Sequence, residues 1–297
     1  MELDRKELKA RAREAIRGAV PSFWVVTLVY FLLTTGVSNL LSLIPSGSGS
    51  AANTGMFSLF LSLLISFYTV IIDFGYKLWS LWTVRKLEPG IDSLIQGFSV
   101  AGLVLILEFF LFIRLLGITL LLSFTLSFFF LLTMGNPFLS VLLIPLLYGA
   151  IFAFMLRYEL SHFLLADYPQ LGPDVAIHRS VMLMKGWKWE LFKLEFSFLG
   201  WILLSSALQA LGIAVSLMLS GVDFSAWLVM EETAMFQQIT LLMNQPLNVL
   251  LMNLFSLPVT LWLMPYRSVA KAEFYDARVQ LAQSDQMTDL FGPIAPI

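Results

Sequence analysis

The stretch at residues 57–86 reads FSLFLSLLISFYTVIIDFGYKLWSLWTVRK, and it decides the fold class. Residues 57–83 form a nearly continuous apolar run, longer than the roughly 20 residues that cross about 30 Å of hydrocarbon as a helix. Trp82 then precedes Arg85 and Lys86, and an aromatic residue followed by basic ones is typical of a membrane boundary. The stretch therefore predicts a transmembrane helix.

Five further apolar segments surround this stretch. They lie at residues 22–44, 100–134, 138–165, 190–219 and 246–265. The chain is 58% hydrophobic and only 13% charged, which is far from the composition of soluble globular proteins. The sequence therefore predicts an all-α fold, a polytopic transmembrane helical bundle of about six spans with short interfacial amphipathic helices.

The third apolar segment is too long for one perpendicular span. At a helical rise of 1.5 Å per residue, residues 100–134 would reach about 50 Å. The segment therefore tilts, begins along the inner membrane surface, or breaks near Gly117.

The 18 Lys and Arg residues are sorted by side of the predicted membrane. If the six segments alternate in direction, all but Lys77 and Arg114 fall in the N-terminal segment, in loops near 84–98 and 157–193, or in the tail. The opposite side receives three segments without any Lys or Arg, at 45–56, 135–137 and 220–245. This positive-inside pattern predicts a multi-pass protein of the cytoplasmic (plasma) membrane with both termini in the cytoplasm.

We expect a single integral-membrane domain over residues 1–297. It would comprise a cytoplasmic amphipathic helix at 1–19, the bundle at 20–268 and a cytoplasmic tail at 269–297. The first apolar run lacks a small-residue cleavage site, so we expect it to be a retained span. The chain has no Cys, which excludes disulfides and thiol chemistry.

A polar stripe runs along the second predicted span. On a helical wheel one narrow face collects Ser58, Ser62, Ser66, Thr69, Asp73, Lys77 and Ser80. Asp73 and Lys77 are four residues apart and can pair, which lowers the cost of both charges. We expect the stripe to be buried inside the bundle, either as a contact between helices or as the wall of a hydrated substrate or ion path.

Two more charged residues complete the candidate polar intramembrane face. Glu108 and Arg114 lie in the third segment, six positions apart, so they do not share a helix face. Arg114 either extends its side chain toward the membrane surface or needs a partner, for which Asp73 and Glu108 are the candidates.

Two amphipathic helices are predicted at the cytoplasmic surface. In the N-terminal helix Lys6, Lys9, Arg13 and Arg17 share one face, which either lies on anionic lipid headgroups or serves only as a topology signal. Residues 176–185 place apolar residues on one face of a helix and basic residues on the other, and Gly186 follows. This pattern is typical of a short interfacial helix.

The sequence lacks the common catalytic signatures. It contains no His-Glu-x-x-His helix, no Gly-x-Ser-x-Gly elbow and no Walker loop. We therefore expect no enzyme, no cofactor, no metal and no nucleic-acid partner, and we name no catalytic residue. Two functions stay open: a non-enzymatic membrane scaffold or accessory module, and a small-molecule or ion transporter or channel that uses the polar face of the second span.

The second half of the chain contains a series of specific motifs. These are Arg157-Tyr158, Leu165-Ala166-Asp167-Tyr168-Pro169, Ala176-Ile177-His178-Arg179-Ser180, Met184-Lys185-Gly186, Ser197-Phe198-Leu199-Gly200-Trp201 and Leu261-Trp262-Leu263-Met264-Pro265-Tyr266. In this order they resemble the bacterial integral-membrane family known as domain of unknown function 975. The specific resemblance covers most of residues 157–275. It implies a polytopic membrane protein and no established activity, so no catalytic residues carry over.

Overall fold

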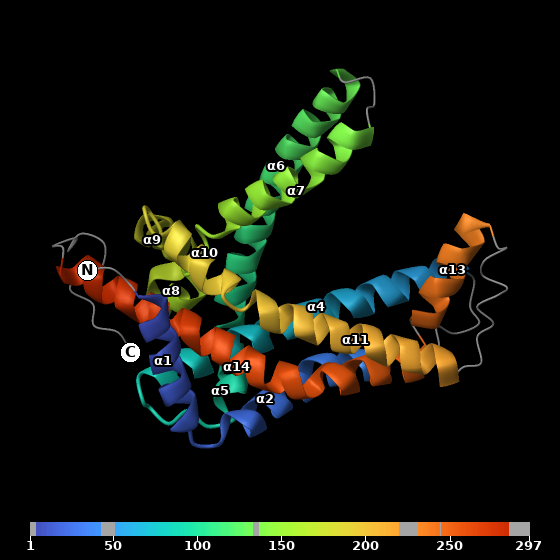
Figure 1. Cartoon of the computed structure of the whole chain (residues 1–297). Coiled ribbons are helices and arrows are strands. Elements are labelled where there is room, and N and C mark those ends of the chain that lie inside the picture. The colour runs from blue at the N-terminus through green and yellow to red at the C-terminus, as the bar shows by residue number, and fades with distance from the viewer. Residues whose placement is uncertain (1–3, 43–50, 133–136, 220–230, 244, 285–297) are drawn as a thin grey trace.

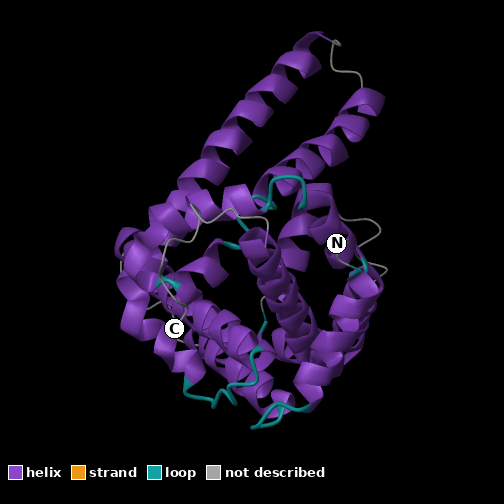
Figure 2. Cartoon of the chain, turned by 90° about the vertical axis from the view of Figure 1, so that its left-hand side faces the viewer, coloured by secondary structure: helices purple, strands orange, loops and turns teal. Residues whose placement is uncertain are grey.

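A computed structural model describes residues 4–42, 51–132, 137–219, 231–243 and 245–284. Within these ranges every regular element is a helix and no strand is present, as Figure 2 shows. The predicted all-α fold is therefore confirmed.

The helices of the first half of the chain are α1 (Arg5–Arg17), α2 (Phe23–Phe31), a π-helical turn (Leu32–Gly36), α3 (Val37–Ser42), α4 (Ala51–Val84), α5 (Ser93–Gln96), a 3₁₀ turn (Gly97–Val100) and α6 (Ala101–Leu132). Those of the second half are α7 (Pro137–Met155), α8 (Ser161–Asp167), a 3₁₀ turn (Pro169–Leu171), α9 (Gly172–Leu183), α10 (Lys188–Phe196), α11 (Leu199–Leu219), α13 (Glu232–Met243) and α14 (Pro246–Ser284).

Among the described residues, 4 helices are long and apolar enough to cross a membrane. They are Leu59–Val84, Ser93–Leu131, Leu199–Leu219 and Leu247–Gln283. Two shorter apolar helices, Phe23–Asn39 and Pro145–Met155, accompany them. The length and composition of these helices suggest a protein embedded in a membrane.

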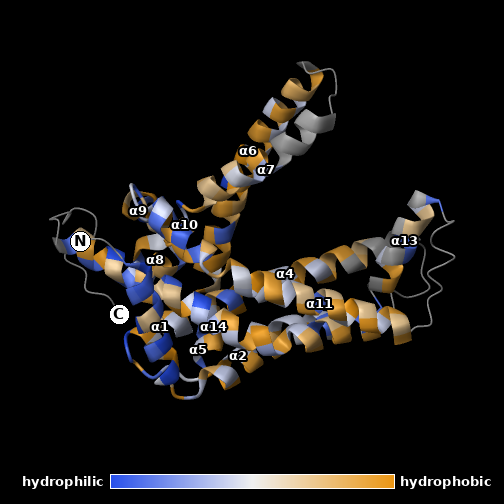
Figure 3. Cartoon of the chain, viewed as in Figure 1, coloured by the Kyte–Doolittle hydropathy of each residue, from blue (hydrophilic) through white to orange (hydrophobic). Residues whose placement is uncertain are grey.

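The helices form two arms on one base (Figure 1). The main arm consists of α2, α11 and the first halves of α4 and α14, which run side by side. The hairpin arm consists of α6 and α7, and it leaves at a wide angle to the main arm. The base consists of α1, α5, α8, α9, α10 and residues 267–284 of α14. Hydrophilic residues gather in the base, whereas both arms are mostly hydrophobic (Figure 3).

The largest buried side chains pack in and next to the base. Trp79, Leu94, Phe163, Phe274 and Tyr275 are all almost fully buried. The sequence assigns the last two to the cytoplasmic tail, yet α14 continues as one helix through Ser284. Because Val269 and Ala270 are also buried, this part of the tail is a structural element of the base.

Two predicted segment boundaries differ from the structure, and a third segment lacks the break that was one of its open alternatives. The segment 138–165 ends as a helix at Met155, and α8 follows a turn. The segment 190–219 is divided near Ser197, so that α11 alone supplies the 21 apolar residues of a span. In residues 100–134, α6 is continuous through Gly117, because one glycine costs a helix only about 1 kcal/mol.

The N-terminal helix packs on the protein. Leu8, Ala12 and Ile16 are buried, and α1 contacts α14. The Lys9 ammonium donates a hydrogen bond of 3.0 Å to Ser197 Oγ and lies 4.5 Å from the centre of the Phe198 ring. On the predicted basic face, Lys9 therefore contacts the base.

Helix α9 corresponds to the predicted amphipathic helix at 176–185. It begins at Gly172, slightly earlier than the predicted start, and ends at Leu183. Ala176 and Ile177 are buried where α9 packs against α8 and α6. Its apolar face is therefore covered by the rest of the chain.

Candidate functional site

Asp73 occupies the point where α2 meets α4. The hydroxyl of Tyr30 donates a hydrogen bond to the Asp73 carboxylate. The Tyr30 ring lies 4.5 Å from the ring of Tyr76, and the hydroxyls of Tyr76 and Thr27 are 3.0 Å apart. Both Thr27 and Tyr76 are buried. Tyrosine hydroxyls of α2 and α4 thus satisfy the polar groups between these two helices.

Glu108 connects the hairpin arm to the base. Its carboxylate on α6 lies 2.5 Å from Nε2 of His162 on α8. The His162 side chain is 12% exposed, whereas that of Glu108 is 37% exposed. Glu108 is therefore a partly open acid with one partner on the protein side.

Lys271 is the centre of an ion-pair cluster inside the base. Its ammonium pairs with Glu159, which precedes α8, and lies 2.9 Å from Glu195 on α10. Glu195 also accepts a hydrogen bond of 2.6 Å from Nε of Arg267, one turn earlier on α14. Because the Glu195 side chain is only 9% exposed, these pairs are shielded from solvent.

Lys77 faces three acids. Glu159, Glu108 and Asp73 all act on its ammonium electrostatically. Lys77 acts on Asp73 electrostatically, but the predicted pair is not formed as an ion pair: the Asp73 carboxylate instead accepts a hydrogen bond from Tyr30. Lys77 therefore balances a group of carboxylates from α4, α6 and the turn before α8.

The polar stripe of α4 is divided in two. Ser62 and Ser66 are exposed, and their hydroxyls bond the helix's own carbonyls at Leu59 and Ser62 over 2.9 and 2.8 Å. Thr69 is half-buried, and Ser80 is buried with its hydroxyl 2.6 Å from that of Ser268. The expected burial is therefore wrong for Ser62 and Ser66, whose internal hydrogen bonds make exposure inexpensive. The side chain of Ser58 lies outside the described residues.

Arg114 has a partner that the sequence did not predict. Its guanidinium lies 3.8 Å from the Asp174 carboxylate of α9 and 3.4 Å from the carbonyl oxygen of Phe110. It also lies 5.9 Å from the ring of Tyr158. The predicted partners, Asp73 and Glu108, are each bonded to another residue. Arg114 thus joins α6 to the base.

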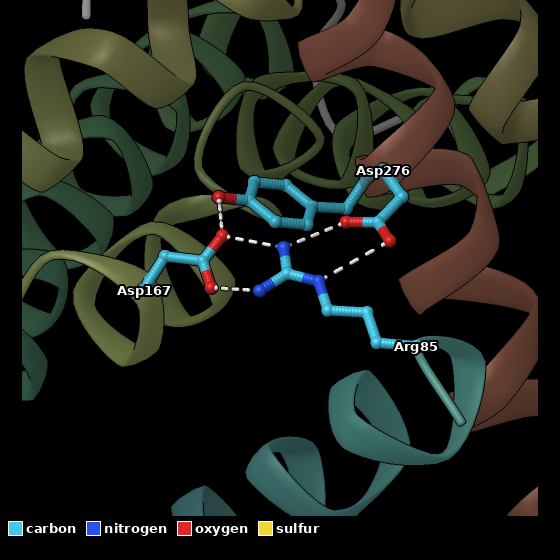
Figure 4. A network of polar contacts seen from close by, with 4 residues as sticks. Arg85, Asp167 and Asp276 are labelled. Atoms are coloured by element: carbon cyan, nitrogen blue, oxygen red, sulfur yellow. Dashed lines mark hydrogen bonds and ion pairs between the residues drawn. The ribbon is translucent and has the colours of Figure 1, made fainter. Parts of the chain in front are cut away.

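Figure 4 shows a second network, which sequence reasoning did not single out. Arg85 donates two hydrogen bonds, of 2.6 and 2.8 Å, to the carboxylate of Asp167 and another of 2.8 Å to Asp276. The Tyr275 hydroxyl donates a further bond of 2.7 Å to Asp167. Burial, followed by the charge of Asp167, raises the pKa of the neighbouring Tyr168 hydroxyl. The sequence signals for this network are the position of Asp167 inside the Leu165–Pro169 motif and that of Tyr275 in Ala272-Glu273-Phe274-Tyr275, which also belongs to the family resemblance.

The Leu165–Pro169 motif is one of those on which the family resemblance rests, and the network gives it a structural role. The family model described as Protein of unknown function (DUF975) matches residues 1–281. The chain belongs to the DUF975 family. No curated protein and no solved structure matches the chain.

The match covers the first half of the chain, where motifs gave no specific resemblance, as well as the second. Several DUF975 motifs fall on the base. Asp167 binds Arg85, and Leu183, just before Met184-Lys185-Gly186, accepts hydrogen bonds of 3.2 and 3.0 Å from the buried guanidinium of Arg278. The motifs therefore coincide with contacts that hold α14 to α8 and α9.

The chemistry of this DUF975 member is that of paired charges. Within the described ranges, no group of three or more His, Asp or Glu side chains is placed to hold a metal ion. The candidate polar face is drawn together only in part: Asp73, Lys77 and Glu108 share one region, whereas Ser62, Ser66 and Arg114 lie apart from it. What the arrangement can do directly is fix helices to one another.

Proposed function

We propose that the chain is a six-span protein of the bacterial cytoplasmic membrane with both termini in the cytoplasm. The support is the agreement of six apolar helices with a one-sided distribution of basic residues. In this arrangement the base lies at the cytoplasmic surface, and α1, α9 and α10 are its interfacial helices. Trp187 and Trp189 at the start of α10 then lie at headgroup level.

We infer a non-enzymatic role as a membrane scaffold or accessory module. The observation that carries this inference is the Lys271 cluster, in which one half-buried cation pairs with acids from two other elements. Buried charges that bond one another are costly to separate, so they hold helices in place. The base is thus a rigid platform, and the charges of the Lys271 cluster are engaged within the protein.

The hairpin arm is the part that meets a partner. It contacts the rest of the chain through α4, α8 and α9, and through Phe152 of α7, whose ring lies 6.0 Å from that of Phe192 on α10. Farther along α6, Phe124 is 76% exposed and Phe128 is 54% exposed, and the two lie on one helix face. We propose that this face packs against the membrane helices of a partner protein.

A photo-crosslinking amino acid at Phe124 tests this role in native membranes. We expect a discrete protein adduct whose yield falls when Phe128 is changed to alanine. Leu203 on α11, which is 61% exposed, is the matched probe position on the main arm and should give no such adduct. Adducts with lipid alone at both positions would overturn the scaffold role.

A transporter or channel is the second candidate, because one charged group remains partly open. Glu108 is 37% exposed and lies in the same group of charges as Lys77 and Asp73. Intramembrane charges of this kind mark ion paths in other membrane proteins. This candidate requires flux through the purified protein, which the scaffold role does not.

A further inference from the structure

A pocket of about 410 Å³ lies between the end of α1, the start of α2 and the middle of α14. Its wall is lined by Arg13, Ile16, Arg17, Phe23, Trp24, Trp262 and Tyr266. The lining combines two cations with four aromatic rings and contains no acid. Such a pocket attracts an anion and offers its ligand an apolar floor.

The two arginines are available to a ligand. Both are exposed on the last turns of α1. Nε of Arg13 donates a hydrogen bond of 3.3 Å to the Lys9 carbonyl, which orients the side chain and leaves its charge uncompensated by that contact. Guanidinium groups bind the oxygens of a phosphate with two parallel hydrogen bonds.

The pocket lies at the boundary between the base and the main arm. The Trp262 ring lies tilted against the rings of Trp201 on α11 and of Tyr266, with ring centres 4.6 and 5.0 Å apart. Tryptophan and tyrosine rings concentrate at the level of lipid headgroups. The charged residues of α14 begin directly afterwards at Arg267. Both features place the pocket at headgroup depth.

An apolar track leads from the pocket along α2. Trp24, Leu28 and Leu32 are 41%, 39% and 56% exposed and follow one another at helical spacing. An acyl chain attached to a bound phosphate would lie along this track. A free phosphate ion would use the arginines and leave the track empty.

We propose that this pocket binds one anionic phospholipid, with the phosphodiester between Arg13 and Arg17 and an acyl chain along α2.

A second groove supplies the control. It has about 470 Å³ and is lined by cations and acids together, among them Arg11, Lys86, Glu14, Glu88 and Glu273. Arg11 pairs with Glu7 over 2.5 Å, so its charge is already compensated.

The test uses the full chain in detergent, with short-chain phosphatidylglycerol as the probe and native mass spectrometry as the measurement. We expect one tightly bound lipid per chain, and a loss of affinity of about tenfold or more in the Arg13→Gln/Arg17→Gln variant. Arg11→Gln removes the same charge from the same helix and should leave the affinity unchanged. Single Arg17→Gln, at an exposed position, should give an intermediate loss and checks the result if the double variant unfolds.

Two comparisons distinguish a phospholipid from free phosphate and test whether the net negative charge of the lipid is required. Inorganic phosphate at the same concentration should not displace the lipid, and zwitterionic phosphatidylcholine of equal chain length should bind at least several times more weakly. Displacement by inorganic phosphate would overturn the assignment to a lipid. An equal loss of affinity in Arg11→Gln would overturn the assignment to this pocket.

Discussion

Arg85 and Asp167 are 82 positions apart in the sequence, yet their side chains form a two-bonded ion pair in which the Asp167 side chain is only 2% exposed. Asp276 and Tyr275 complete the contact from α14. Three helices that are distant in sequence are thereby fixed at one point. This contact, together with the Lys271 cluster, supports the proposal that the base is a rigid platform.

We predict that Asp167→Asn destabilises the protein by about 3 kcal/mol, because it leaves the half-buried guanidinium of Arg85 with one carboxylate instead of two. Thermal unfolding of the purified protein in detergent measures this change. Glu7→Gln removes an exposed ion pair with Arg11 and should cost less than about 0.5 kcal/mol. Equal losses of stability in the two variants would contradict the prediction that Asp167 contributes more than an exposed ion pair.

The Lys271 cluster predicts non-additive stability effects. Lys271→Met leaves the acids Glu159 and Glu195 facing each other without their common cation, so we expect a loss of about 3 kcal/mol or more. Adding Glu159→Gln should recover part of this loss, since one unpaired charge is then gone. A double-mutant cycle on unfolding temperature checks the coupling, and strictly additive losses would contradict it.

The close approach of α4 and α5 predicts a sharp contrast between two glycines. A Cβ atom on Gly75 would lie 2.2 Å from the backbone oxygen of Leu94, so Gly75→Ala forces the helices apart. We expect it to cost about 2 kcal/mol or more. Gly102→Ala, where a Cβ meets nothing within 4 Å, should be neutral or stabilising by up to about 1 kcal/mol. Unfolding temperatures of both variants decide the point.

Membrane orientation is open to direct labelling because the chain has no Cys. A single cysteine at Ser48, which lies outside the described residues, should react with an impermeant thiol reagent on intact cells. A cysteine at Glu88, in the loop after α4, should react only after permeabilisation. The reverse pattern would invert the proposed topology.

The sequence predicted the helices well where the apolar runs are long. Hydrocarbon thickness sets a minimum length for a span, and the apolar runs exceed it, so their helical state follows from composition alone. The division at Ser197 was missed although four of the nine residues of α10 are charged, because its apolar residues continue directly into those of α11. What separates them is the packing of Glu195 against Lys271, which depends on residues far away in the chain.

The sequence predicted the residues of the candidate site better than it predicted the contacts between them. Asp73 was expected beside Lys77 because residues four apart are neighbours on a helix. In the structure the Asp73 carboxylate accepts a hydrogen bond from Tyr30, which is 43 positions away on α2. Arg114 likewise pairs with Asp174 on α9. Periodicity identifies the face of one helix, and only the arrangement of several helices decides which residues meet.

On the proposed scaffold role, the charges around Asp73 serve assembly and not transport. The most direct test reconstitutes the wild-type protein and Asp73→Asn in liposomes and measures proton and ion flux together with the unfolding temperature, with Ser62→Ala as the control. We predict that wild-type liposomes remain ion-tight, and that Asp73→Asn lowers the unfolding temperature because the bond from Tyr30 is weakened, while Ser62→Ala changes neither. Flux through the wild-type protein that Asp73→Asn abolishes at an unchanged unfolding temperature would contradict the claim.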